Sequence, residues 1–318
     1  MATIKTFVSV DWGTTNLRLR LVEVPSLQII EEVVSPKGIK TIYNEWVNCG
    51  GDKETYFLTF LKKQLALFSN TITSDVAIVV SGMASSSIGL RELPYASLPF
   101  KTDGKSLYIE KIRSDIIPNM IHLISGVKSD SDVIRGEEVE IIGLVNEEDK
   151  NHSVVFVTPG THSKHVVCEK GEITNFFTFM TGEVFSVISE YTILKASIEK
   201  TEFDETVLNA FEEGVQKAME GKSLLNTLFK VRTNNLFKEK TNIENYYYLS
   251  GLLIGEELQS LRDLPCDSIK LCAGGKLFEL YHSAICVLGL ESKTEIIQAN
   301  LVDLSVVKGQ WNILKNQL

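Results

Sequence analysis

The sequence predicts an α/β fold with mixed sheets, built as two similar domains. The chain has 318 residues, which is long enough for two hydrophobic cores. Apolar strand patterns alternate with helical patterns, so hairpins are mixed with helical crossovers. One strand–turn–strand pattern, centred on Gly-Thr, occurs near residue 13 and again near residue 160. This repetition suggests that the two domains resemble each other.

Short apolar runs predict the strands, at 4–10, 17–24, 76–81, 154–158, 164–169, 269–273 and 294–298. Apolar residues recur at helical spacing in 54–68, and further helices are predicted at 137–145, 183–195, 204–220, 246–262, 276–288 and 303–315. Polar stretches on both sides of 137–145 mark the domain boundary. We therefore expect an N-terminal domain of residues 1–135 and a C-terminal domain of residues 136–318.

Composition limits the class of function. The net charge of −9 argues against a nucleic-acid binder, because phosphate backbones require a basic surface. The five cysteines are scattered and odd in number, which is typical of reduced thiols in a cytoplasmic protein. No apolar run reaches the ~18 residues of a membrane span, and the sequence enters a strand pattern without a signal peptide. We expect a cytoplasmic protein that binds neither nucleic acid nor membrane.

The first Gly-Thr turn suits a phosphate loop. An apolar run ends in Asp11, and Gly13, Thr14 and Thr15 follow in a turn before an alternating strand. Turn amides and hydroxyls can bind phosphate oxygens, and a carboxylate at the end of a strand can hold Mg²⁺ directly or through water. The same residue types also make ordinary hairpins.

The second turn, Thr158-Pro-Gly160-Thr161-His162, aligns with the first, and Thr158 stands where the first turn has Asp11. Only the first turn would therefore bring a carboxylate to a metal. Gly160, Thr161, His162 and the following Lys164 are candidates for the second phosphate loop, although two hairpins can be similar by chance. His162 and His165 do not form a metal pair, because residues i and i+3 of a strand point to opposite faces.

Several segments in order resemble the motifs of one family: Asp11-Trp-Gly-Thr-Thr-Asn-Leu-Arg, Ser81-Gly-Met-Ala-Ser-Ser, Arg135-Gly-Glu-Glu, Thr158-Pro-Gly-Thr-His-Ser-Lys-His, Met180-Thr-Gly-Glu, Ser250-Gly-Leu-Leu-Ile-Gly-Glu and Ala273-Gly-Gly. With this set, which covers nearly the whole chain, the sequence resembles the 2-dehydro-3-deoxygalactonokinases of the sugar-kinase, actin and Hsp70 ATPase superfamily. The resemblance implies two ribonuclease H-like domains flanking an ATP cleft. It also implies ATP- and Mg²⁺-dependent phosphorylation of 2-dehydro-3-deoxy-D-galactonate at its 6-hydroxyl.

The segment Arg135-Gly-Glu137-Glu138 is the best candidate for the catalytic base. In related sugar kinases the base is an acidic residue after a Gly at the corresponding point, commonly Asp. Glu137, next to the Gly, is favoured over Glu138 by a small margin, and the choice between them stays open. The acids could instead only complement the dipole at a helix start.

The resemblance implies a substrate carboxylate, and arginine binds carboxylates through paired hydrogen bonds. Arg18 and Arg135 are the candidates. By strand alternation Arg18 shares a face with Asn16 and with Arg20, and Arg20 is expected to be solvated on the surface. Further candidates for contacts with the substrate are Gly82, Met83, Ser85, Tyr95 and Glu183. Glu183 could equally be a residue that caps a helix.

The nucleotide pocket is expected at Gly274 and Gly275, because glycines between a strand and a helix let an adenosine approach the backbone, as in the adenosine motif of the superfamily that the chain resembles. Ser250 and Gly251 would line the opposite side of this pocket. The sequence contains no Walker motif, so a P-loop kinase is disfavoured. A homodimer is possible, and the sequence does not distinguish galacto from gluco substrates. Two other functions stay open: a regulatory or assembly ATPase on the same fold, and a kinase for a related sugar acid.

Overall fold

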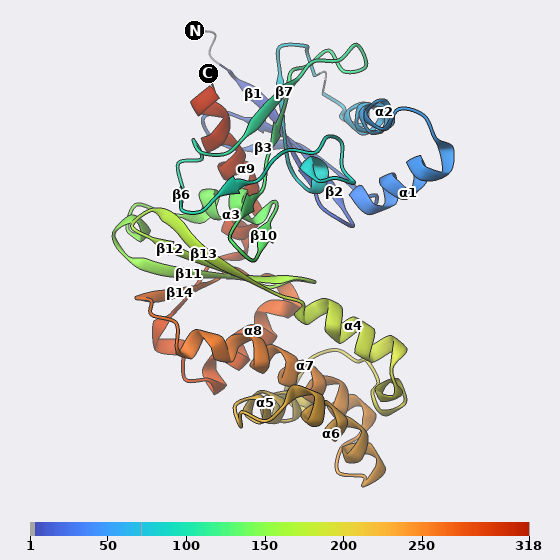
Figure 1. Ribbon diagram of the computed structural model, residues 1–318, viewed down its shortest axis with the longest axis vertical. Coiled ribbons are helices and arrows are strands. Elements are labelled where there is room, and N and C mark those ends of the chain that lie inside the picture. Colours follow the sequence, from blue (N-terminus) through green and yellow to red (C-terminus); the bar gives the residue numbers. More distant parts are fainter. Residues whose placement is uncertain (1–3, 71, 318) are drawn as a thin grey trace. The chain divides into compact units, whose positions relative to one another are not determined.

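The protein forms two compact units in the computed structural model, which describes residues 4–70 and 72–317. Unit 1 comprises Met1–Lys150, Gly171–Asn175 and Asn300–Leu318, and unit 2 comprises Asn151–Lys170 and Phe176–Ala299. Both are α/β with mixed sheets, as predicted (Figure 1). The sequence-based division at residue 135 differs from these units, because the segment up to Lys150 and the C-terminal helix both lie in unit 1.

Unit 1 contains a six-stranded sheet of order β3-β2-β1-β4-β8-β7. Its strands are β1 (Thr6–Trp12), β2 (Leu17–Glu23), β3 (Ile29–Ser35), β4 (Ala77–Gly82), β7 (Ile109–Ile112) and β8 (Ile121–Ile124). The strands β3, β2 and β1 are antiparallel, β1, β4 and β8 are parallel, and β7 returns antiparallel. A small second sheet joins β5 (Ala96–Ser97), β9 (Val127–Lys128) and β10 (Val133–Ile134).

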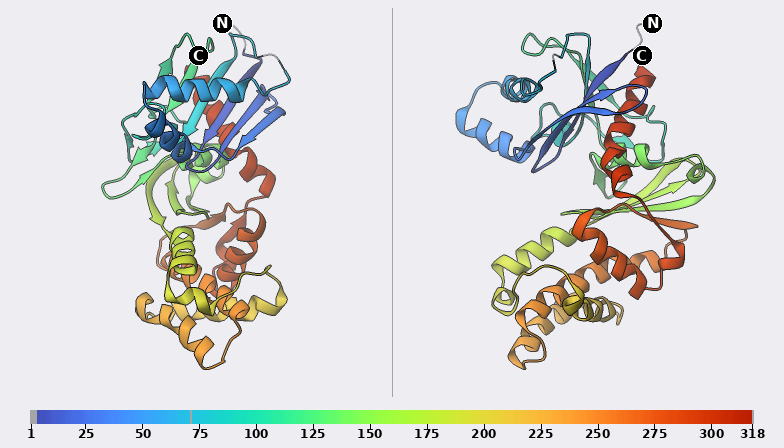
Figure 2. Two further views of the ribbon diagram at one scale, coloured as in Figure 1. Left: turned by 90° about the vertical axis from the view of Figure 1, so that its right-hand side faces the viewer. Right: turned by 180° about the vertical axis from the view of Figure 1, so that it is seen from behind.

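The two faces of this sheet differ in character. One face is apolar and packs on α1 (Ile39–Cys49) and α2 (Lys53–Leu65), with Trp12, Leu17 and Phe57 fully buried between them. The opposite face of the sheet is covered by α9 (Ala299–Leu314), where the ring of Phe7 stacks on that of Trp311 with centroids 5.9 Å apart. The right-hand view of Figure 2 shows α1 and α2 on one side of the sheet and α9 on the other.

Unit 2 repeats the strand order of unit 1. Its strands are β11 (Ser153–Thr158), β12 (Ser163–Glu169), the later part of β13 (Glu172–Phe179), β14 (Ser268–Leu271) and β15 (Thr294–Ile296). The first residues of β13 belong to unit 1, where they pair with β6 (Phe100–Lys101). The order β13-β12-β11-β14-β15 matches β3-β2-β1-β4-β8, with an antiparallel β11–β12 hairpin and parallel β11, β14 and β15. The two units therefore share one topology.

The helices of unit 2 gather on one side of its sheet (Figure 2). They are α4 (Thr181–Tyr191), α5 (Glu205–Ala218), α6 (Leu224–Leu236), α7 (Asn242–Leu258) and α8 (Gly275–Val287). Among the described helices, none combines the length and apolar character needed to cross a membrane.

Most predicted elements are confirmed, with ends that differ by a few residues. The sequence missed α1, α6, β3, β13 and the short strands between 96 and 134. The predicted helix 137–145 is α3 (Glu137–Leu144), and the predicted helix 303–315 is α9. The missed β3, Ile-Ile-Glu-Glu-Val-Val-Ser, lies at the edge of its sheet, and its apolar residues stand in adjacent pairs, so the sequence shows no strand-like alternation.

Two glycines allow α3 and α9 to cross closely in unit 1. A Cβ atom on Gly309 would lie 1.9 Å from the carbonyl oxygen of Val139, and a Cβ on Gly143 would lie 1.9 Å from that of Ser305. Neither position requires glycine because of its backbone dihedral angles. Glycine is required at both because any side chain would push the backbones of α3 and α9 apart.

We predict that Gly309→Ala destabilises the protein by roughly 1–3 kcal/mol, because the added methyl overpacks the crossing of α3 and α9. Without the close crossing, replacing glycine by alanine should stabilise a helix by about 1 kcal/mol, so a loss of stability would indicate that the crossing exists. Urea unfolding measures it. Lys308→Ala, one residue away on the same helix, is the control and should change the unfolding free energy by less than about 0.5 kcal/mol. A stabilised Gly309→Ala protein would contradict the crossing.

Candidate functional site

The first Gly-Thr turn is held in place by the start of α1. The amide of Gly13 donates to the Asn16 carbonyl at 3.0 Å and closes the turn. The amides of Gly38, Ile39 and Lys40 donate to the carbonyls of Thr15, Gly13 and Thr14 at 2.9–3.1 Å. A Cβ on Gly38 would lie 2.4 Å from the Thr14 carbonyl oxygen, so only glycine permits this approach. The carbonyls of the turn are thus occupied, while Thr14, Thr15 and Asn16 are exposed.

The second turn is held by the start of α4 in the same way. The amide of Glu183 donates to the Thr161 carbonyl at 3.0 Å. A Cβ on Gly182 would lie 2.7 Å from the Gly160 carbonyl oxygen, so Gly182 takes the part that Gly38 takes in unit 1. The Glu183 amide is therefore engaged within the fold and is not free to bind a ligand. In both units the helix after the third strand supports the Gly-Thr turn.

The two turns are not identical. In unit 1 Asp11 pairs with Arg18, seven residues later, whereas in unit 2 Thr158, which aligns with Asp11, pairs with Lys164, six residues later, so the connection in unit 2 is one residue shorter. The Nζ of buried Lys164 donates to the His162 carbonyl at 2.9 Å and so braces the turn. His162 and Glu183 form a half-exposed pair with Nε2 and Oε2 2.6 Å apart.

Asp11 lies at the end of β1, opposite Ser81 of β4. The next residue of β4, Gly82, has φ of +85°, and a Cβ there would lie 2.8 Å from the Trp12 carbonyl oxygen. Gly136, with φ of +114°, precedes α3, and a Cβ on it would lie 3.3 Å from the Gly82 Cα. Two glycines in left-handed backbone regions therefore let the ends of β1 and β4 meet the start of α3.

Carboxyl groups accumulate at this junction. Burial raises the pKa of Asp11, the charge of Glu137 adds to the rise, and Arg18 and Arg20 oppose it. Burial also raises the pKa of Glu138 to about 8 and that of Glu140 to about 8, with the charge of Glu137 as the next cause in both. Acids that raise one another's pKa form a region of negative potential that a cation would relieve.

Glu137 and Glu138, which the sequence left as alternatives, have different surroundings. Glu138 is buried, and both of its oxygens accept from the Gly136 amide, at 2.8 and 3.0 Å. Glu137 is partly exposed, and its Oε2 accepts from the Arg135 amide at 3.0 Å. With a pKa of about 8, Glu138 is mostly protonated at neutral pH and is a poor base.

Three predicted substrate residues come together beside this junction. The Nη1 of Arg135 donates to the carbonyl and, at 2.6 Å, to the Oγ of Ser85, and its guanidinium carbon lies 4.2 Å from the ring centroid of Tyr95. Ser85 ends a short 3₁₀ helix, Met83–Ser85, and Met83 packs against the apolar core with only part of its side chain accessible. Arg135 is therefore oriented by both neighbours.

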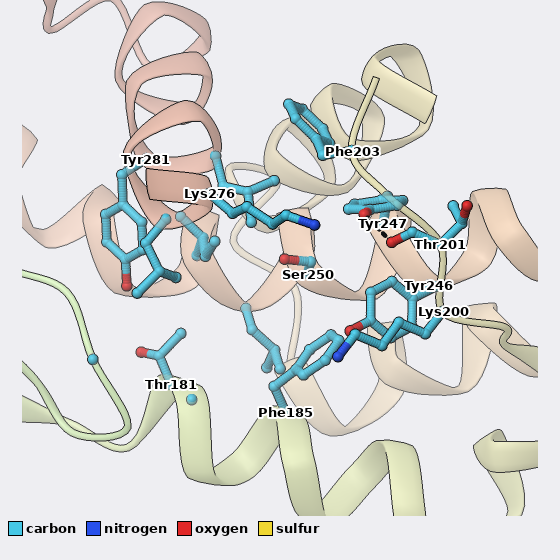
Figure 3. A pocket seen from close by; sticks show the side chains of 16 residues that line it. Thr181, Phe185, Lys200, Thr201, Phe203, Tyr246, Tyr247, Ser250, Lys276 and Tyr281 are labelled. Atoms are coloured by element: carbon cyan, nitrogen blue, oxygen red, sulfur yellow. Dashed lines mark hydrogen bonds between the residues drawn. The ribbon is translucent and has the colours of Figure 1, made fainter. Parts of the chain in front are cut away.

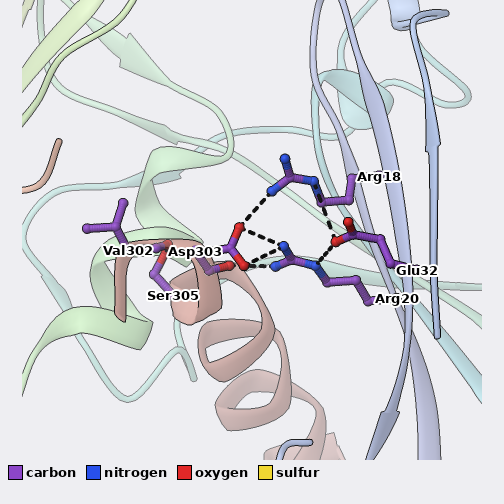
Figure 4. A network of polar contacts seen from close by, with 6 residues as sticks. All are labelled: Arg18, Arg20, Glu32, Val302, Asp303 and Ser305. Atoms are coloured by element: carbon purple, nitrogen blue, oxygen red, sulfur yellow. Dashed lines mark hydrogen bonds and ion pairs between the residues drawn. The ribbon is translucent and has the colours of Figure 1, made fainter. Parts of the chain in front are cut away.

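Arg20 is not solvated, and the sequence-based expectation for it is wrong. It is 5% exposed, its Nη2 lies 2.7 Å from both carboxylate oxygens of Asp303 on α9, and its Nε lies 2.5 Å from Glu32 of β3 (Figure 4). Strand alternation predicted correctly which face of the sheet carries Arg20, but α9 covers that face, so the side chain is not exposed to solvent. Arg18 also contacts Asp303, at 3.0 Å, and is 42% exposed.

Unit 2 contains a pocket of about 220 Å³ between α4, α7, α8 and the segment 200–203. Its walls are mostly aromatic and aliphatic, with a few polar groups, as Figure 3 shows. The polar lining comes from Thr181, Lys200, Thr201, Ser250 and Lys276, and Gly160 and Gly182 contribute backbone from the second turn. Tyr246 and Tyr247, which the sequence reading treated as a helix start, also line it.

Of the four predicted nucleotide residues, Ser250 lines this pocket. Gly251 instead faces α5, where a Cβ would lie 1.9 Å from the Phe211 carbonyl oxygen, so the structure gives it a packing role. Gly274 precedes α8 and Gly275 begins it; both are exposed, and a Cβ on either would meet nothing within 4 Å. Their backbone is open to a ligand.

A buried carboxylate, Glu257 of α7, connects the walls of the pocket to the second turn. Its Oε1 accepts from Ser163 Oγ at 2.6 Å and lies 3.1 Å from His165 Nε2. Its Oε2 accepts from Thr181 Oγ1 and, at 2.7 Å, from the Tyr281 hydroxyl. Glu257 thus ties together β12, α4 and α8 around the pocket.

Burial acts to raise the pKa of Glu257, but the hydrogen bonds and charge it receives outweigh burial and lower its pKa. The sequence did not identify this residue, although an acid within the apolar stretch 252–258 was a signal. It also missed Glu140 and Gly38, which have no signal beyond their positions near other candidates.

We predict that Glu257→Gln lowers the free energy of unfolding at pH 7 by roughly 1–3 kcal/mol, because the amide leaves buried donors imperfectly paired. A carboxylate with a lowered pKa contributes stability above its unfolded pKa of about 4.3, and loses it as pH falls through the folded pKa. The gap between the two proteins should therefore narrow in acid.

Chemical unfolding between pH 3 and 8 measures this gap. Glu256→Gln, at the neighbouring and partly exposed position, is the matched control and should leave stability nearly unchanged. A gap that stays constant with pH would mean that Glu257 stabilises the fold by shape alone.

Comparison with known proteins identifies the family. The model of the 2-keto-3-deoxy-galactonokinase family matches residues 11–309. A 2-dehydro-3-deoxygalactonokinase of Escherichia coli (strain K12) is 28% identical over 294 residues, which is 90% of this chain and 91% of the relative. "Probable 2-dehydro-3-deoxygalactonokinase DgoK1" of Rhizobium meliloti (strain 1021) is 29% identical over 313 residues, 95% and 97% of the two chains.

A solved structure agrees with these relatives. The crystal structure of a proposed 2-dehydro-3-deoxygalactonokinase from Sinorhizobium meliloti is 27% identical, covers 98% of this chain and 96% of its own, and has a TM-score of 0.82. The family match extends from Asp11 at the first turn to Gly309 at the crossing of α3 and α9. The chain belongs to the 2-keto-3-deoxy-galactonokinase family of carbohydrate kinases.

Proposed function

We propose that this protein transfers the γ-phosphoryl group of ATP to the 6-hydroxyl of 2-dehydro-3-deoxy-D-galactonate. One observation carries the proposal: the ends of β1 and β4 meet the start of α3, so that Asp11, Glu137 and Arg135 belong to one junction in unit 1. Phosphoryl transfer to an alcohol needs a cation site, a base and a substrate anchor, and these are the residues that can provide them.

We propose that both units are ribonuclease H-like domains whose Gly-Thr turns hold the phosphates of ATP in a cleft between them. The shared strand order and the shared way in which a helix start supports each turn argue for this arrangement. The transfer requires that the nucleotide on unit 2 and the sugar acid on unit 1 meet in the catalytic state.

The aromatic pocket of unit 2 is the proposed site for the adenosine part of ATP. The open backbone at Gly274 and Gly275 and the side chain of Ser250 would approach the nucleoside, and Lys200 and Lys276 carry positive charge toward an anionic ligand. The hydroxyl of Thr158 is buried beside the second turn and, among the described residues, has no hydrogen-bond partner. A phosphate oxygen on Gly160, Thr161 and His162 would satisfy such a group.

The acids of unit 1 fit a Mg²⁺ ion, because they combine hard oxygen ligands with a negative potential that raises their pKa. We propose that Asp11 holds this ion directly or through water, with Glu140 close to it. Bound there, Mg²⁺ would neutralise charge on the phosphate oxygens. Thr14 and Thr15 would hold the phosphates from the exposed side of the first turn.

We propose that Arg135 binds the carboxylate of the sugar acid, because Ser85 and Tyr95 already fix the direction of its guanidinium. Gly82 and Met83 would lie along the same substrate, and Asn16 would approach it from the first turn. Arg18 can contact it only by releasing Asp303. Glu183 is paired with His162 and would contact the substrate from the second turn.

Glu137 is the proposed base. As the 6-oxygen forms its bond to the γ-phosphorus and ADP leaves, Glu137 would take the hydroxyl proton. Its partial exposure suits this role better than the burial of Glu138. The cytoplasmic location and a homodimer, expected from the sequence, stay predictions.

A panel assay of ADP release tests the function. We expect ADP to form rapidly with 2-dehydro-3-deoxy-D-galactonate, slowly with aldonic acids that lack the 2-keto group, and hardly at all without a sugar acid. ADP release that is indifferent to every sugar acid would favour the alternative, a regulatory or assembly ATPase. Rapid turnover of the gluco epimer alone would identify a kinase for a related sugar acid.

The base has its own test in a matched pair of variants. Glu137→Gln should lower kcat by roughly 10²–10⁴-fold and leave the affinity for ATP nearly unchanged, because general bases contribute factors of this size. Glu138→Gln should keep most of the turnover, since Glu138 is mostly protonated at neutral pH. Steady-state kinetics at pH 7 measures both variants. The opposite pattern would assign the base to Glu138.

A further inference from the structure

Three side chains with different metal-binding atoms converge at the end of α8 in unit 2. His282 and Cys286 are one helical turn apart on α8, and Glu291 begins the 3₁₀ helix η5 (Glu291–Lys293). One ligand atom from each of the three lies within 4.8 Å of the others. The sequence analysis did not identify this group, because the end of α8 and a turn separate Glu291 from His282 and Cys286.

The fold holds these residues in place. Residues i and i+4 share a helix face, and the opposite face of α8 is anchored by buried Ala284 and Ile285. At the end of the helix, Gly289 has φ of +70°, its amide donates to the Cys286 carbonyl, and the Leu290 amide donates to the Ile285 carbonyl, both at 3.0 Å. This closed turn returns Glu291 to the face that carries Cys286.

The neighbouring groups fit a cation. Glu291 brings one carboxylate to the group, and Glu212 on α5 accepts a hydrogen bond from Ser283 Oγ at 3.4 Å, which holds a second carboxylate beside this part of α8. The ring of His282 is positioned by stacking on Phe278, with centroids 5.5 Å apart.

Within the described part of the chain, the side chains of His282, Cys286 and Glu291 form no hydrogen bond or ion pair with the side chain of another residue, and the packing contact of His282 with Phe278 leaves its ring nitrogens unpaired. Cys286 is exposed and free, and Glu291 is exposed, so an ion can reach the group from solvent. The fold therefore presents three ligand atoms together without using them.

We propose that His282, Cys286 and Glu291 form a binding site for a thiolate-accepting divalent metal of the Zn²⁺ class. Imidazole nitrogen, thiolate sulfur and carboxylate oxygen are the ligands that Zn²⁺ takes in proteins, and three of them leave a fourth position for water. Binding releases the thiol proton to solvent. Mg²⁺ does not fit, because it requires oxygen ligands.

This site is separate from the proposed reaction. Its three residues do not line the pocket of unit 2, whereas the preceding half of α8 does, through Lys276, Leu277, Leu280 and Tyr281. The acids that would hold Mg²⁺ lie in unit 1. Metal binding at α8 can therefore be measured without any assay of turnover.

Titration of the untagged, chelator-treated protein with Co²⁺ tests the proposal. We expect one ion per chain, a ligand-to-metal charge-transfer band in the near ultraviolet, and displacement of Co²⁺ by Zn²⁺. Cys286→Ser should abolish the band, and Glu291→Gln and His282→Gln should each weaken binding by roughly 10-fold or more. Circular dichroism establishes that each variant is folded.

Cys49→Ser is the matched control, because Cys49 is also exposed and free but lies on α1 of unit 1. It should keep the band and the affinity of the wild type. The proposal is overturned if the wild type shows no thiolate band, if Cys286→Ser retains it, or if Cys49→Ser loses it.

Discussion

The arrangement of unit 1 depends on how α9 covers the polar face of the first sheet. Gln310 donates to the Val10 carbonyl at 3.0 Å and to Ser81 Oγ at 2.8 Å, at the ends of the two strands that carry Asp11 and Gly82. The same helix crosses α3 through Gly309, and α3 begins with Glu137. One helix therefore fixes the proposed metal ligand and the proposed base relative to each other. The ion pair of buried Arg20 with the half-exposed Asp303 secures α9 on the sheet.

The Gly-Thr turns owe their shape to a second device, which both units use. A turn that presents amides and hydroxyls outward must have its carbonyls engaged, because unpaired backbone groups are costly. The first amides of α1 and α4 provide this engagement, and Gly38 and Gly182 allow the close approach. A helix start that bonds a turn no longer has all of its own amides for a ligand, so a phosphate would be bound mainly by the turn.

The sequence predicted some of these features and missed others, because each sequence pattern carries only one kind of information. Hydrophobic periodicity located most of the long elements, although not α1, α6, β3 or β13, and strand alternation predicted the correct face for Arg20. Alternation does not report what covers a face, so it could not reveal that Asp303, 283 residues away, pairs with Arg20. Gly251 was read as a ligand contact because of its motif, whereas the close crossing of α5 and α7 accounts for it. Such crossings depend on tertiary packing that no local pattern records.

Desolvation acts on acids in both units, but the resulting pKa shifts have opposite directions, and this difference bears on function. Glu257 receives hydrogen bonds from several side chains, and its pKa is lowered despite burial. Asp11 and Glu140 lie among other acids, and their pKa values are raised. A buried carboxylate with a purely structural role receives hydrogen bonds from neighbouring donor groups. Where like charges take the place of donors, the acids bind protons more readily, and a cation bound there, as proposed for Mg²⁺, would relieve the repulsion between them.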